Sequence, residues 1–121
     1  MSITVTAYFQ TLDAKKYNRI EQLGNQTVDS VQDFDGLSAK VNAGVQQVLR
    51  EGKTSTEYLA LPAVGGKQHW KIRLDATGVP GTSDSDFYYY HEIGGHNLRD
   101  VFTLTKKALQ DKASDLGFTG N

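Results

Sequence analysis

The spacing of apolar residues changes close to Lys53, near the middle of this chain. Before that point, the segment from Leu37 to Leu49 carries an apolar residue every three or four positions, which is the spacing of one face of an α-helix. After it, apolar and polar residues alternate, which is typical of a strand with one buried face. A change of period of this kind predicts an α+β fold.

The N-terminal half is predicted to hold one strand and two helices. Residues 2–9 alternate polar and apolar side chains and include several β-branched residues, so they predict the first strand. Asp13 is a suitable N-cap for a first helix that would stop at Gly24. The second helix contains the apolar stripe and would stop at Gly52, although Gly44 costs it about 1 kcal/mol relative to alanine. Tertiary packing must therefore hold this helix.

The C-terminal half is predicted to form three antiparallel strands and a short helix. Its only other feature is a short extended run from Tyr58 to Leu61, which Pro62 ends. Gly94-Gly95 is a hairpin turn between the second and third of these strands. The predicted segments are a strand from His69 to Leu74, a strand from Phe87 to Ile93, a strand from Leu98 to Thr105, and a terminal helix carrying Leu109, Ala113 and Leu116.

Composition limits the classes of protein that fit. The 121 residues match one domain, 1–121. The chain has no cysteine, which excludes disulfides and thiolate zinc sites and favours a reducing compartment such as the cytoplasm. The first residues show no signal peptide or membrane span, so no membrane partner is expected. The net charge of −1 argues against binding nucleic acid through the overall field of the protein.

One short motif resembles a metal site but has the wrong spacing. His91 and His96 flank Glu92 and the Gly94-Gly95 pair. Zinc-protease helices place two histidines four residues apart, so that both lie on one helix face, whereas five residues leave them about 140° apart. A hairpin tip with flanking histidines fits the sequence better, and we expect neither a metal nor another cofactor.

The strand from His69 to Leu74 carries the clearest candidate for a functional surface. Trp70, Ile72 and Leu74 would point to the core, and the alternate residues His69, Lys71 and Arg73 would share the other face. Such a face is often only a solvated surface. With aromatic and basic neighbours, however, it could hold a phosphate, stack a base and transfer protons without a metal. The neighbours that the predicted pairing offers are Tyr88, Tyr89, Tyr90, His91, Lys106 and Lys107.

Several segments together resemble the RelE/ParE superfamily of bacterial toxins, the RelE/HigB-like toxins of type II toxin–antitoxin systems. The resembling segments are Leu59 to Pro62, His69 to Leu74, Phe87 to Tyr90, the Gly94-Gly95 turn and Val101 to Lys107. The resemblance implies a RelE-like, microbial RNase-like fold, with an N-terminal strand and two helices, then a three-stranded antiparallel sheet and a short C-terminal helix. It also implies a cytoplasmic toxin that an antitoxin protein holds inactive.

The RNA-cleaving toxins of this family cut mRNA at the ribosome without a metal. What the resemblance implies for this chain is a metal-independent endoribonuclease with Lys71 as general base. Arg73 with Lys106 or Lys107 would stabilise the charge on the phosphate, and His91 would act as an acid or base. His69, Tyr88 and Tyr90 would bind the RNA.

Two other functions stay open from the sequence. The first is a non-catalytic binding module of the same fold, either a ParE-like gyrase inhibitor or another protein that only binds a partner. The slightly acidic net charge favours it, and so does Ser85-Asp86, which stands where RNA-cleaving relatives carry an arginine. The second is an interaction protein of unrelated fold.

Overall fold

The structure, a computed structural model, describes residues 3–13, 16–59, 61–62, 65, 69–79, 100–114 and 116–118. Within these residues, strands and helices occupy separate stretches of chain, which confirms the predicted α+β class. Their bounds, in chain order, are β1 (Ile3–Asp13), β2 (Lys16–Val28), α1 (Asp33–Arg50), α2 (Thr56–Leu59), β3 (Trp70–Thr77) and α3 (Val101–Asp111).

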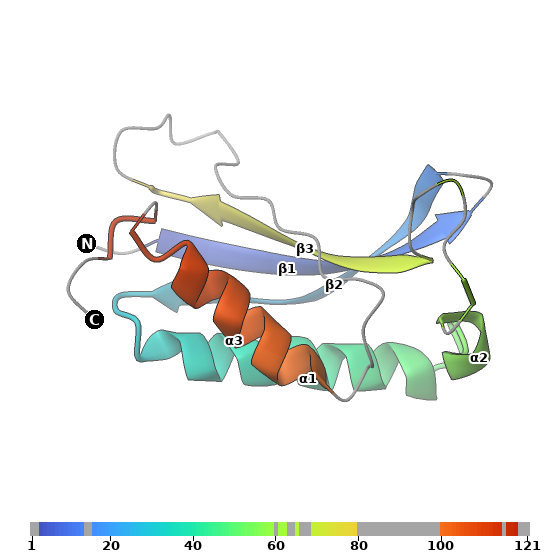
Figure 1. Ribbon diagram of the computed structural model, residues 1–121. Coiled ribbons are helices and arrows are strands. Elements are labelled where there is room, and N and C mark those ends of the chain that lie inside the picture. The colour runs from blue at the N-terminus through green and yellow to red at the C-terminus, as the bar shows by residue number, and fades with distance from the viewer. Residues whose placement is uncertain are drawn as a thin grey trace.

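The described strands form one antiparallel sheet with β1 in the centre and the order β2-β1-β3. β1 pairs with β2 from Ile3↔Val28 to Asp13↔Lys16. It pairs with β3 from Thr4↔Thr77 to Thr11↔Trp70. α1 and α3 both lie on one side of this sheet (Figure 1), so the sheet has a covered face and an opposite face.

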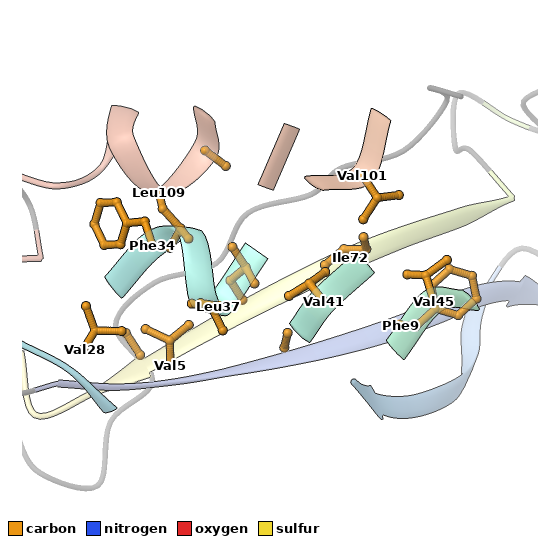
Figure 2. Packing of buried hydrophobic residues seen from close by; sticks show 14 of the residues in the cluster. Val5, Phe9, Val28, Phe34, Leu37, Val41, Val45, Ile72, Val101 and Leu109 are labelled. Atoms are coloured by element: carbon orange, nitrogen blue, oxygen red, sulfur yellow. The ribbon is translucent and has the colours of Figure 1, made fainter. Parts of the chain in front are cut away.

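The core lies between the sheet and the two long helices. Figure 2 shows Val5, Phe9 and Ile72 of the sheet together with Val41 of α1 and Leu109 of α3 in this layer. Alternate residues of β1 and β3 are buried here, as the period of two predicts, and the Phe9 and Trp70 rings stack with centroids 6.0 Å apart. The buried apolar residues of β1, β3, α1 and α3 are Ile3, Val5, Ala7, Phe9, Leu12, Trp70, Ile72, Leu74, Ala76, Phe34, Leu37, Val41, Val45, Val48, Val101, Ala108 and Leu109.

α1 is the helix that the apolar stripe predicts, and its contact with β2 explains a glycine in its middle. A Cβ at Gly44 would stand 2.9 Å from both the Cβ and the carbonyl oxygen of Leu23, so only glycine allows this approach. The helix ends before Gly52, as predicted. Gly52 has a φ of 71°, which lies in the left-handed region that favours glycine. Lys53 then reaches back to β2, where its Nζ lies 3.0 Å from Oε2 of Glu21.

The predicted helix from Asp13 to Gly24 is wrong, because this segment is β2. The register of β1 against β2 shifts between Ala7 and Tyr8 and between Thr11 and Leu12. Each shift leaves one extra residue in β2, which breaks the alternation of apolar residues. The resulting spacing of three between Tyr17, Ile20 and Leu23 reads as a helix when the partner strand is unknown.

The predicted strand from Leu98 to Thr105 is also wrong from residue 101 onward, where α3 begins. Its β-branched and aromatic residues have strand propensity, but the buried positions Val101, Thr105, Ala108 and Leu109 follow helical spacing and pack toward α1. The terminal helix thus starts at Val101 rather than near Leu109.

The remaining predictions for the second half have mixed outcomes. The strand from His69 to Leu74 corresponds to β3, whereas the extended run at Tyr58 contains the helical turn α2. The strand from Phe87 to Ile93 and the Gly94-Gly95 turn lie outside the described residues. A three-stranded antiparallel sheet is present, but it consists of β1, β2 and β3 rather than of three successive C-terminal strands.

Membrane insertion through a helix finds no support in the described part of the chain. None of its helices combines the length and the apolar character that crossing a bilayer would need.

Candidate functional site

The face of β1 and β3 that points away from α1 and α3 gathers polar and charged residues, and we call it the outer face. It consists of Tyr8 and Gln10 from β1 and of Lys71, Arg73 and Asp75 from β3, which alternate with the buried core residues. The register places Tyr8 opposite Arg73 and Gln10 opposite Lys71. Directly opposite residues have Cβ atoms about 5 Å apart, so these side chains form one contiguous surface.

Arg73 is held in place on this face by two neighbours. Its Nε donates to Oδ1 of Asp75 at 2.8 Å, and its Cζ lies 5.9 Å from the centroid of the Tyr8 ring. The Asp75 side chain is only 2% exposed, while the Arg73 side chain is 33% exposed. A buried carboxylate and an aromatic ring therefore orient a guanidinium group that still reaches the surface.

Gln10 and His69 carry polar atoms that are buried and have no hydrogen-bond partner within the described structure. These atoms are Oε1 of Gln10 and Nδ1 of His69. An unpaired buried polar atom costs about 1–3 kcal/mol, so such atoms usually mark a place where a water molecule or a ligand supplies the missing bond.

His69 is fixed at the start of β3 by contacts with β1 and α2. Its carbonyl oxygen accepts from the Leu12 N–H at 2.8 Å. Its ring packs edge to face on Tyr58, with centroids 5.1 Å apart, and the Tyr58 hydroxyl donates to the carbonyl oxygen of Leu12. These contacts tie His69 to the end of β1 and to α2.

The two C-terminal lysines lie elsewhere. Lys106 and Lys107 are on α3, which covers the opposite face of the sheet (Figure 1). Lys106 pairs with Asp35 of α1 at 2.7 Å, and Lys107 pairs with Asp111 at 3.1 Å. The structure therefore brings Lys71 and Arg73 together on one face of β3, with His69 just before the start of this strand, but it separates the two cations from Lys106 and Lys107 by the thickness of the sheet.

Three predicted site residues, Tyr88, Tyr90 and His91, lie outside the described residues. Within the described part of the chain, no cluster of three or more histidine, aspartate or glutamate side chains is placed to hold a metal ion.

Sequence reasoning missed Tyr8, Gln10 and Asp75. Tyr8 is an even position of the first predicted strand and alternates with its core positions, and Gln10 continues this alternation one residue beyond the predicted end. Only the pairing of β1 with β3 shows that Tyr8 and Gln10 stand opposite the basic residues. Asp75 follows Arg73 by two positions on the same face, and this spacing was a usable signal for an ion pair.

Comparison with known proteins assigns no function to this surface. No protein-family model, no curated protein and no solved structure matches the chain. The chemistry of the outer face is therefore the basis for a functional proposal.

Proposed function

We propose that this chain is a non-catalytic binding module that binds a protein partner through the outer face. The observation that carries this proposal is the fixed position of Arg73 between Asp75 and Tyr8. Arginine and tyrosine are enriched among the residues that contribute most to protein–protein binding. A side chain that is ordered before binding also loses less conformational entropy when the partner arrives.

The chemistry of a suitable partner follows from the remaining residues. Lys71 adds a second cation to the outer face, and the buried amide of Gln10 lies opposite it. Carboxylates match the fork of a guanidinium. An acidic segment therefore fits this surface.

The alternative proposal is the RelE-like toxin, an endoribonuclease that acts on mRNA at the ribosome and is held by an antitoxin. The common face of Lys71 and Arg73 favours it, since a base and a phosphate-binding cation are neighbours there. The positions of Lys106 and Lys107 weigh against it, because they lie across the sheet from the base they would assist. The engagement of Arg73 by Asp75 also lowers the positive charge available to a phosphate.

Incubation of mRNA with purified ribosomes and this protein distinguishes the two proposals. For a binding module we expect intact transcripts, with no difference between the wild-type chain and the Lys71→Ala variant. Cleavage that disappears in Lys71→Ala would instead establish the endoribonuclease. The Lys107→Ala variant serves as a control on α3.

Partner binding is tested with charge reversals on the two sides of the sheet. The tagged full chain is expressed in its host, and co-purifying proteins are compared between wild type, Lys71→Glu and Lys107→Glu. We expect a protein that is retained by wild type and Lys107→Glu and lost with Lys71→Glu. A protein retained equally by all three chains, or lost only with Lys107→Glu, would contradict the assignment of the outer face.

A further inference from the structure

The contact between α1 and α3 contains buried hydroxyl groups that have no hydrogen-bond partner within the described residues. Ser38 of α1 and Thr105 of α3 are fully buried, and their Oγ and Oγ1 atoms are both unpaired. Ser38 follows Asp35 by three residues and Thr105 precedes Lys106, so both hydroxyls lie near the ion pair that joins Asp35 to Lys106. Because an unpaired buried polar atom destabilises the contact that buries it, the docking of α3 on α1 is weakened at its middle.

α3 also lacks the local features that stabilise a helix on its own. It has 11 residues, and an isolated helix shorter than about 12 residues is marginal in water. Its N-cap, Asp100, makes no side-chain capping bond, and neither an acidic residue in the first turn nor a basic residue in the last turn complements the helix dipole. Val101, Thr103 and Thr105 are β-branched and favour a strand. α3 is therefore helical because it packs on α1.

α1, in contrast, is attached to the sheet along its whole length by contacts that do not involve α3. Near its start, Nε2 of Gln26 in β2 donates to the carbonyl oxygen of Asp33 at 3.3 Å. In its middle, Gly44 allows the close approach to β2 described above. Just after its end, Nζ of Lys53 lies 3.0 Å from Oε2 of Glu21. The packing of α1 on β2 therefore does not depend on the position of α3.

The residues that follow α3 are bonded to its C-terminal end. The Leu116 N–H donates to the carbonyl oxygen of Lys112 at 3.0 Å, and the Phe118 N–H donates to the carbonyl oxygen of Ala113 at 2.8 Å. Both side chains are buried, and the Phe118 ring packs edge to face on Phe34 of α1, with centroids 5.9 Å apart. Residues 116–118 therefore belong to the same packing unit as α3.

We propose that α3 and residues 116–118 form one unit that undocks from α1 and docks again as a whole, while β1, β2, β3 and α1 stay folded. Undocking lets water bond to the hydroxyls of Ser38 and Thr105, which favours the open state. It also exposes the apolar face of α1 around Phe34 and Leu37, which is fully buried when α3 is docked. This face lies on the side of the sheet opposite the outer face (Figure 1), so the opening is separate from the proposed binding.

Hydrogen exchange of the full wild-type chain at low denaturant concentrations tests the proposal. Backbone amides from Thr105 to Leu109 should exchange at least about tenfold faster than the paired amides of β1. Their exchange should also depend less on denaturant, because a local opening exposes less surface than global unfolding. Equal rates with equal denaturant dependence in α3 and β1 would overturn the proposal, and so would exchange of the α1 amides together with those of α3.

Three variants test the role of the buried hydroxyls. Thr105→Val replaces an unpaired hydroxyl by a methyl group of similar size and should slow exchange of the α3 amides about fivefold. Ser38→Ala should act in the same direction from the side of α1. Thr103→Val makes the same chemical change at an exposed position of α3 and should leave the exchange within about twofold of wild type. Exchange in α3 that is unchanged or faster in both Thr105→Val and Ser38→Ala would overturn the proposal.

Discussion

At the scale of single residues, the outer face depends on one buried carboxylate. Asp75 is almost fully buried, yet it lies on the side of the sheet away from α1 and α3, and Arg73 is its ion-pair partner. Breaking a buried pair by removing one partner leaves an uncompensated charge, which is far more costly than losing a surface pair. Arg73 thus stabilises the folded chain as well as contributing to the proposed binding.

We expect Arg73→Ala to lower the free energy of unfolding by about 2 kcal/mol, because it leaves the Asp75 carboxylate buried without this partner. This value is below the roughly 3–5 kcal/mol expected for a fully buried pair, since the Arg73 side chain is partly exposed to water. Chemical denaturation measures it. Lys107→Ala, which removes an exposed pair, should cost less than about 0.5 kcal/mol, and equal losses in the two variants would contradict this account.

At the scale of elements, the packing of α1 on β2 decides how the helix tolerates substitution. Gly44 faces the backbone of Leu23, whereas Gly36 faces only the flexible end of the Gln26 side chain. Two glycines of one helix should therefore respond oppositely to the same change.

Gly44→Ala should destabilise the protein by about 1–3 kcal/mol, because the new Cβ forces α1 away from β2 despite its better helix propensity. Gly36→Ala should be neutral or should stabilise by up to about 1 kcal/mol, because a glutamine side chain can move aside. Thermal unfolding of the two variants is the measurement, and stabilisation by Gly44→Ala would show that the contact with Leu23 is not close.

The junction between α1 and β2 also has a defined pH dependence. The hydrogen bonds that Lys53 donates to the carboxylates of Glu21 and Glu51 raise the pKa of Lys53 above its ordinary 10.5. Hydrogen bonds from Gln47 and Lys53 lower the pKa of Glu51 below its ordinary 4.5. The stabilisation from Lys53 is therefore complete below pH 10.5 and is lost as the pH rises through the raised pKa of Lys53. The stabilisation from Glu51 is complete above pH 4.5 and is lost as the pH falls through the lowered pKa of Glu51.

Lys53→Met should accordingly have a slightly lower free energy of unfolding than wild type at neutral pH. The difference in the free energy of unfolding between the two chains should shrink in acid below pH 4.5 and in base above pH 10.5. Denaturation curves across this range provide the test. A difference that is constant at every pH would mean that the lysine contributes only through its apolar stem.

At the scale of the whole molecule, the sheet separates the outer face from the two long helices. The outer face uses β1 and β3, whereas α1 and α3 lie on the opposite side of the sheet. A substitution at an exposed position of α3 should therefore leave binding through the outer face unchanged.

The sequence alone determined the elements whose signal is local. The apolar stripe of α1 and the alternation in β1 and β3 were readable because each element buries one face at its own period, and the same alternation placed Lys71 and Arg73 away from the core. The tertiary structure decided the rest. β2 was misread because two extra residues in its pairing with β1 break the alternation, and α3 was misread because strand-prone residues become helical when they pack on α1. Tyr8 and Gln10 joined the candidate site only through the register of β1 against β3, since contacts between residues far apart in the chain leave no period in the sequence.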